Sequence, residues 1–115
     1  MSRSILVVDD DATMLGVYTR LFTGAGYLIS KTTSFAEAVR LINSKNYDLL
    51  ITDLMLGDGL GTDLIKLFEK KQAGAKSLLV SGSVAILAPE QIPEIYFEKP
   101  FKAEVFMDAV NKALS

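Results

Sequence analysis

Short apolar runs alternate with segments of helical periodicity along the sequence, and this alternation limits the possible folds more than any other feature. The runs are mostly continuous rather than alternating in polarity, which is typical of strands buried on both faces of a sheet. Strands that alternate with helices form parallel sheets with right-handed crossovers. The sequence therefore predicts an α/β fold with a mostly parallel sheet. The expected strands span residues 4–8, 27–32, 48–53, 77–81 and 95–98.

Capping residues and glycines mark the ends of the expected helices. Asp11 is suited to cap the first helix, and Gly26 is suited to end it. Ser34 and Glu37 have the spacing of a capping box, which predicts the start of a second helix. The residues expected to face the core are Met14, Leu15, Tyr18, Leu21, Phe22 and Ala25 in the first helix, Phe35, Ala38, Val39 and Ile42 in the second, Leu64, Ile65 and Phe68 in the third, and Val105, Phe106, Ala109, Val110, Ala113 and Leu114 in the last.

The helical pattern weakens in residues 82–94. Only residues 84–88 have a helical composition there, because Pro89 and Pro93 prevent a longer helix. We therefore expect the fourth helix to be shortened or irregular. The uncharged residues 84–88 allow two interpretations, a short packed helix or an exposed contact for a partner or a second copy.

Composition excludes several classes of function. The chain has 115 residues, enough for one domain with a single core. It contains no cysteine and no histidine, so disulfides, thiolate metal sites and histidine-based catalysis are excluded. The net charge is −2 with scattered basic residues, which does not indicate nucleic-acid binding. The apolar run at residues 5–8 is too short for a signal peptide or a membrane span, so we expect a soluble, cytoplasmic protein.

Charged and hydroxyl side chains follow the predicted strands at the point where each strand ends. In a parallel sheet these carboxyl ends lie at one edge, where open α/β sheets bind their ligands. Carboxylates that lie close together repel one another, and Mg²⁺ relieves the repulsion because it prefers oxygen ligands. Asp9 and Asp10 alone also fit helix caps or a solvated loop, but the other residues at this edge favour a metal site. The residues at this edge are Asp9, Asp10, Asp53, Ser81 and Lys99.

This combination of residues predicts phosphoryl chemistry. A carboxylate beside Mg²⁺ and a lysine can attack a phosphoryl group and form an acyl phosphate. Asp53 is the candidate nucleophile, Lys99 would neutralise phosphoryl oxygens, and the Ser81 hydroxyl would donate to one of them. Gly82 leaves space beside Ser81, and a cis peptide bond at Pro100 would fix the direction of Lys99.

The same residues carry a family resemblance over essentially the whole chain. At these spacings the sequence resembles the receiver domain of bacterial two-component response regulators. The resemblance implies a flavodoxin-like (βα)₅ three-layer sandwich with strand order 2-1-3-4-5. It also implies a signalling domain rather than an enzyme. The matching residues are Asp9-Asp10, Asp53, Ser81-Gly82 and Lys99-Pro100-Phe101.

Site roles follow from this resemblance. It implies that a histidine kinase or phosphotransfer protein transfers a phosphoryl group to Asp53. Mg²⁺ would be held by Asp9, Asp10, Asp53 and the Met55 carbonyl, partly through water. Ser81 would move toward the phosphate, and Tyr96, three residues before Lys99, would change rotamer. Ordinary packing at the sheet edge is an equally open interpretation of Tyr96.

The sequence departs from the family pattern at two places, and its residues also allow two rival functions. Gly57 stands where a proline often follows the acceptor in the family. The family's fourth helix normally lies in residues 82–94, and here Pro89 and Pro93 interrupt that segment. One rival is a pseudo-receiver that binds partners without phosphorylation. The other is a phosphatase of the haloacid-dehalogenase type, with Asp9 as nucleophile and Asp11 as general acid. That family needs a further acidic pair on a strand after its lysine, which residues after Lys99 do not supply.

The expected domain is a single receiver spanning residues 1–115. Phosphorylation would shift the populations of the protein's conformations and so switch a protein-interaction surface around Tyr96 and residues 82–94. The sequence leaves open whether this is a stand-alone receiver or part of a longer protein. It also leaves open the kinase, the downstream partner or output domain, and whether the chain forms a homodimer.

Overall fold

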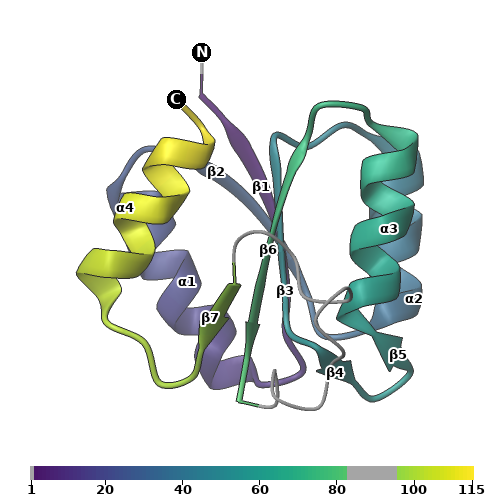
Figure 1. Cartoon of the computed structure of the whole chain (residues 1–115), viewed down its shortest axis with the longest axis horizontal. Helices are drawn as coiled ribbons and strands as arrows, with labels where there is room; N and C mark the ends of the chain where they lie inside the picture. The colour runs from purple at the N-terminus through teal and green to yellow at the C-terminus, as the bar shows by residue number, and fades with distance from the viewer. Residues whose placement is uncertain (1, 83–95) are drawn as a thin grey trace.

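The chain folds into a sheet with helices on both faces, as Figure 1 shows. The computed structural model describes residues 2–82 and 96–115. The main strands are β1 (Ser4–Val8), β2 (Leu28–Thr32), β3 (Leu49–Thr52), β6 (Lys76–Ser81) and β7 (Tyr96–Glu98). A small hairpin is formed by β4 (Met55–Leu56) and β5 (Gly59–Leu60). The helices are α1 (Ala12–Gly24), α2 (Phe35–Ser44), α3 (Gly61–Lys71) and α4 (Ala103–Ala113).

The main sheet has the predicted topology. Its strand order is β2-β1-β3-β6-β7, and all neighbouring strands are parallel. Counting only these five strands along the chain, the order is 2-1-3-4-5. Helices α1 and α4 cover one face, and α2 and α3 cover the other (Figure 1). The three-layer, flavodoxin-like fold is therefore confirmed.

The central strands are buried on both faces, as their continuous hydropathy predicted. Leu6 and Leu50 pack toward α2 and α3, whereas Val7 and Ile51 pack toward α1 and α4. All four residues of β3 are buried. Alternate side chains of one strand thus serve two separate cores, which fixes the register of β3 against its neighbours.

The predicted caps form, with one difference. Asp11 accepts a hydrogen bond from the Thr13 amide at 2.9 Å, and Ser34 Oγ accepts one from the Glu37 amide at 3.2 Å. The amide of Ser34 donates to Thr32 Oγ1 at 3.3 Å, so the second hydrogen bond of a capping box is replaced by one from the preceding strand. Gly26 follows α1 with φ of 85°, a conformation that glycine adopts without strain.

One small element was not predicted, and two residues expected to face the core do not. The glycine-rich segment after Asp53, for which no strand was predicted, contains the antiparallel β4–β5 hairpin. The core prediction was wrong for Val105, which is 54% exposed while Phe106 is fully buried. The helix begins at Ala103, and its first three residues are all exposed. The core prediction was also wrong for Ala25, which is exposed and lies just after the end of α1. The segment predicted to be irregular, residues 82–94, lies outside the described residues except for Gly82.

Within residues 2–82 and 96–115, no helix is both long and apolar enough to cross a membrane.

An aromatic cluster joins α1 to the segment around α4. The Tyr18 ring stacks with Phe22 and Phe101 at centroid distances of 6.0 and 6.3 Å. Phe101 stacks in turn on Phe106 at 4.5 Å. Tyr18 is buried, and its hydroxyl forms no hydrogen bond within the part of the chain that the structure describes. Burial and the charges of nearby carboxylates raise the pKa of Tyr18, so the hydroxyl stays protonated.

Removing this hydroxyl should stabilise the fold. Tyr18→Phe is expected to raise the free energy of unfolding by about 1 kcal/mol, because a buried polar group without a partner costs desolvation energy. Urea unfolding followed by circular dichroism measures the change. Tyr27→Phe is the matched control, because the Tyr27 hydroxyl donates to Asn111 and its loss should not stabilise the protein. A lower stability of Tyr18→Phe would show that the hydroxyl has a partner.

Candidate functional site

Asp9 and Asp53 are brought together by strand pairing. Val8 of β1 lies opposite Thr52 of β3 in a parallel register, so the residues that follow them emerge side by side. The Asp53 amide donates to the Val8 carbonyl at 3.0 Å, and the Asp9 amide donates to the Thr32 carbonyl at 3.2 Å. The backbone hydrogen bonds between strands thus continue one residue past the ends of β1 and β3 and fix the backbone of both aspartates.

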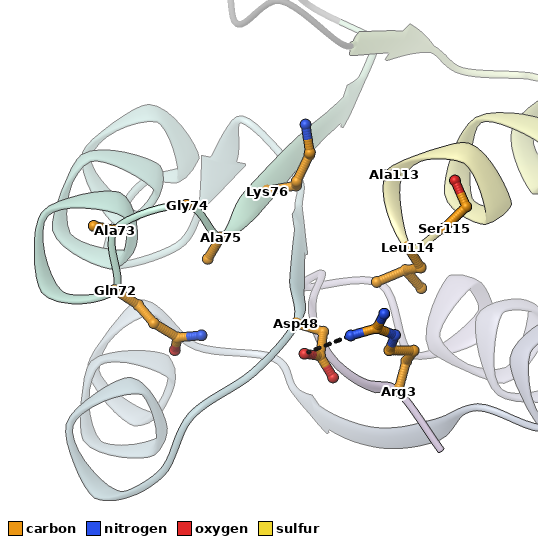
Figure 2. A pocket seen from close by; sticks show the side chains of 10 residues that line it. All are labelled: Arg3, Asp48, Gln72, Ala73, Gly74, Ala75, Lys76, Ala113, Leu114 and Ser115. Carbon is orange, nitrogen blue, oxygen red and sulfur yellow. Dashed lines mark ion pairs between the residues drawn. The ribbon is translucent and has the colours of Figure 1, made fainter. Parts of the chain in front are cut away.

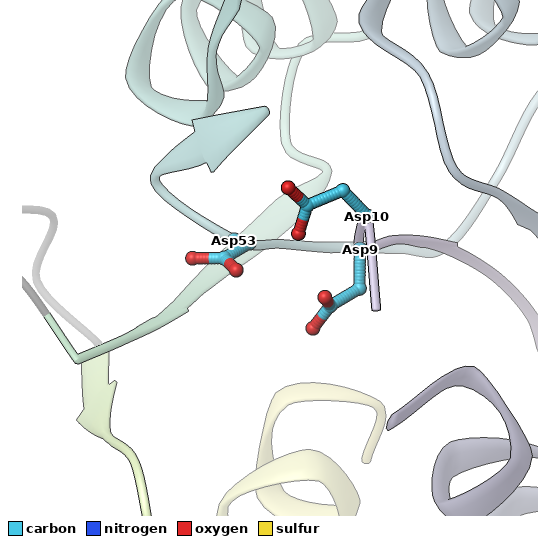
Figure 3. Close-up of side chains that lie close together, drawn as sticks. All are labelled: Asp9, Asp10 and Asp53. Atoms are coloured by element: carbon cyan, nitrogen blue, oxygen red, sulfur yellow. The ribbon is translucent and has the colours of Figure 1, made fainter. Parts of the chain in front are cut away.

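Three carboxylates gather at this edge of the sheet, as Figure 3 shows. One oxygen from each of Asp9, Asp10 and Asp53 lies within 4.8 Å of the others. Asp9 is buried, Asp53 is partly buried and Asp10 is exposed. The cluster therefore has one side toward the protein and one side toward solvent.

Lys99 joins two of these carboxylates. Its Nζ lies 2.9 Å from Asp9 Oδ2 and 3.1 Å from Asp53 Oδ2. The Lys99 amide donates to the Ser81 carbonyl at 3.2 Å, which extends the pairing of β7 with β6 to the lysine. The Lys99–Pro100 peptide bond is cis, as the sequence suggested.

Burial and ion pairing act in opposite directions in this group. Burial raises the pKa of the Asp9 carboxyl, although hydrogen bonds from Lys99 and the Asp11 amide oppose the rise. Burial would lower the pKa of Lys99, but hydrogen bonds to Asp9 and Asp53 outweigh it and raise that pKa. Lys99 has two carboxylate partners and is firmly charged. A further cation beside Asp9 would favour its ionised form, as Lys99 does.

The donor set fits a hard divalent cation. The three carboxylates supply only oxygen, and one lysine does not neutralise all of them. Mg²⁺ takes oxygen ligands and usually keeps several waters, so an open side toward solvent suits it. Met55, the predicted carbonyl ligand, lies two residues after Asp53 in β4, and its side chain is exposed.

The segment after Asp53 is held tightly against α3. The Gly61 amide donates to the Leu54 carbonyl at 2.7 Å, and Thr52 Oγ1 donates to the Asp53 carbonyl at 2.9 Å. A Cβ atom at Gly61 would lie 1.9 Å from the Asp53 carbonyl oxygen. Only glycine allows the start of α3 to approach the Asp53 backbone so closely.

The other predicted residues lie on β6 and β7. Ser81 is buried at the end of β6, opposite Glu98 in the register of the two strands. Tyr96 begins the edge strand β7 and is 43% exposed. The structure therefore places Ser81 at the carboxyl edge with Lys99, while Tyr96 lies two residues before that edge.

One residue of this region was not predicted. Asp58, in the turn of the β4–β5 hairpin, accepts hydrogen bonds from two amides at the start of α2. An aspartate between two glycines resembles an ordinary turn, so the sequence carried no signal for a contact with residues more than twenty positions away.

A separate hollow lies at the amino-terminal edge of the sheet, at the other end of the strands (Figure 2). It has a volume of about 380 Å³, and Arg3 and Asp48 form an ion pair of 3.7 Å in it. Lys76 also lines it. None of the predicted site residues contributes to this hollow.

Comparison with known proteins identifies consistent relatives. The sequence matches the family model for the response regulator receiver domain over residues 5–111. It is 30% identical to the transcriptional regulatory protein GlrR of Escherichia coli, over 96% of this chain and 26% of that protein. It is also 30% identical to the DNA-binding transcriptional regulator NtrC of Rhizobium meliloti, over 97% of this chain and 24% of that protein. The chain thus spans about a quarter of the length of these curated relatives.

A solved structure shares the fold. The response regulator receiver domain protein (CheY-like) from Methanospirillum hungatei superimposes with a TM-score of 0.90 at 23% identity. The alignment covers 99% of this chain and 94% of that one.

Proposed function

Because the chain belongs to the response regulator receiver domain family, we propose that it accepts a phosphoryl group on Asp53 and transmits that event to a protein partner. One observation carries the assignment of the acceptor. Lys99 is held between Asp9 and Asp53, and Asp53 is the more accessible of these two carboxylates. The ammonium group of Lys99 would therefore lie next to a phosphoryl group on Asp53.

The donor is a phosphohistidine of a histidine kinase or a phosphotransfer protein. An Asp53 carboxylate oxygen attacks phosphorus, the P–N bond breaks, and the imidazole leaves with the electron pair. Lys99 neutralises charge on the phosphoryl oxygens, and the Ser81 hydroxyl donates to one of them. Such transfer depends chiefly on positioning and charge neutralisation.

Asp9, Asp10, Asp53 and the Met55 carbonyl would hold the Mg²⁺ ion. When bound, Mg²⁺ supplies positive charge that offsets the carboxylates and the incoming phosphoryl group. Asp10 is the exposed member of the cluster, so it is available to the ion without breaking the contacts of Lys99.

The response begins at Ser81 and Lys99. Phosphorylation replaces about one charge on Asp53 by about two, which gives both side chains a stronger partner in that state. The partly exposed Tyr96 on β7 is the candidate for relaying this change to the surface. The receiver would span residues 1–115 as one domain, work in the cytoplasm, and act through an output domain or a separate protein. A homodimer remains an alternative for the signalling form.

Contacts of Asp9 disfavour the phosphatase alternative. Asp9 is 1% exposed, its Oδ1 accepts from the Asp11 amide, and its Oδ2 accepts from Lys99. A nucleophile needs a free oxygen that faces the substrate, and Asp53 offers this better. The complete acidic cluster disfavours a pseudo-receiver.

Beryllofluoride with Mg²⁺ tests the proposal, because this pair mimics a phosphorylated aspartate. We expect Mg²⁺-dependent chemical-shift changes in ¹⁵N spectra around Asp53, Ser81 and Tyr96. Changes at Asp53 and Ser81 without any at Tyr96 would support the acceptor and remove Tyr96 from the response. No change at any of them would favour a pseudo-receiver.

A further inference from the structure

The β4–β5 hairpin touches the start of α2 through one carboxylate. Asp58 Oδ1 accepts from the Phe35 amide at 2.8 Å, and Asp58 Oδ2 accepts from the Ala36 amide at 3.0 Å. Both oxygens are therefore engaged, each by a different amide of the same helix end. Hydrogen bonds from Ala36 and then Phe35 lower the pKa of Asp58, so the carboxyl stays ionised.

These contacts complete the amino terminus of α2. The first amides of a helix have no partner within the helix. Ser34 Oγ takes the amide of Glu37, and Asp58 takes the two amides before it. An ionised carboxylate is also favoured there by the helix dipole. The helix thus binds the hairpin as it would bind an anion.

A second contact presses the hairpin against the same helix end. A Cβ atom at Gly59 would lie 2.6 Å from Cδ2 of Phe35 and 3.2 Å from its Cβ. The hairpin backbone therefore lies directly on this side chain. Asp58 and Gly59 hold adjacent points of the turn on adjacent residues of α2.

The other end of the hairpin leads to the acceptor. Met55 pairs with Leu60, so the two arms are only a few residues long. The Gly61 amide donates to the Leu54 carbonyl, and the start of α3 packs on the backbone of Asp53. A displacement of the turn would therefore move β4, which carries Met55.

We propose that Asp58 is a positioning residue, which clamps the β4–β5 hairpin onto α2 and so holds the Met55 carbonyl in place for the cation. The clamp rests on the proposed function for the role of Mg²⁺, and it adds a contact that the resemblance did not imply. Asp58 itself does not bind the ion or the phosphoryl group.

Four variants separate the clamp from other effects. Asp58→Asn removes the charge and one acceptor, whereas Asp58→Glu keeps the charge but moves the carboxylate by one carbon. Gly59→Ala pushes the turn away from Phe35 and leaves Asp58 unchanged. Ser34→Ala is the matched control, because it weakens the same helix end without touching the hairpin.

Two readouts on unphosphorylated protein test the proposal. The dissociation constant for Mg²⁺, measured by NMR titration, should rise about tenfold in Asp58→Asn and Asp58→Glu, as it does when supporting residues around a metal are removed. Hydrogen exchange of the hairpin amides in metal-free protein should be faster in these variants. Gly59→Ala should change both readouts in the same direction, and Ser34→Ala should change neither.

Each contrary result has a distinct meaning. If Asp58→Glu kept the wild-type Mg²⁺ affinity and Asp58→Asn lost it, the clamp would be contradicted. A long-range effect of the Asp58 charge would then explain the result. An equal loss in Ser34→Ala would show that α2 stability, not the hairpin, matters. If the wild-type protein bound no Mg²⁺, the proposed function would be contradicted, and hydrogen exchange alone would then decide for or against the clamp.

Discussion

Asp53→Asn is expected to reduce phosphoryl uptake from a cognate kinase or a small-molecule phosphodonor to background. The amide cannot act as the nucleophile, and the other carboxylates do not replace it. Asp9 is buried and paired on both oxygens, and Asp10 lies at the exposed side of the cluster. Intact-protein mass spectrometry measures the incorporation of phosphate and thus the loss of uptake.

Comparison with Asp9→Asn makes this result specific. Asp9→Asn removes the same charge but keeps the acceptor, so it should still be phosphorylated when Mg²⁺ is raised. Asp108→Asn, on the exposed side of α4, should match the wild type. The phosphatase alternative predicts the reverse, with uptake lost in Asp9→Asn and kept in Asp53→Asn. That reverse pattern would sink the assignment of Asp53.

Loss of uptake in Asp53→Asn should not come from unfolding. The substitution removes one of three clustered carboxylates, which relieves repulsion, and Lys99 keeps its contact with Asp9. The thermal midpoint of the variant should therefore equal or exceed that of the wild type. A lower midpoint would mean that Asp53 is needed for the fold, and uptake would then have to be judged on Asp53→Glu.

Gly61→Ala is expected to be the most destabilising of the single-methyl additions. Its Cβ would lie 1.9 Å from the Asp53 carbonyl oxygen and 3.0 Å from Thr52 Oγ1. The first of these is a backbone atom held by its neighbours, so it cannot move aside cheaply. We expect a loss of about 3 kcal/mol in the free energy of unfolding, at the upper end for an overpacked site. Urea unfolding monitored by circular dichroism measures it.

Gly57→Ala is the matched control. A Cβ at Gly57 meets no atom within 4 Å, and its φ lies outside the left-handed range. Its stability should therefore stay within about 1 kcal/mol of the wild type. Because Gly61 packs on the backbone of Asp53, the proposed acceptor, Gly61→Ala should also slow phosphorylation where it remains folded, whereas Gly57→Ala should not. Equal stabilities of the two variants would contradict the close approach at Gly61.

Much of the site was predictable because it depends on strand ends. Asp9 and Asp53 follow continuous apolar runs, and parallel pairing of those runs places both aspartates at one edge. The same reasoning placed Ser81 and Lys99 there. Sequence reasoning did not predict that Val105 is exposed, because helical periodicity marks a stripe of apolar residues but not how much of that stripe the core covers.

The sequence by itself determined the α/β class and the edge that carries the carboxylates. It did so because burial of strands on both faces and right-handed crossovers are set by local patterns. Tertiary structure alone decided which groups meet. Lys99 pairs with Asp9 and Asp53, and Asp58 clamps the start of α2. These contacts join side chains from separate elements, and their partners depend on how the layers pack rather than on any spacing along the chain.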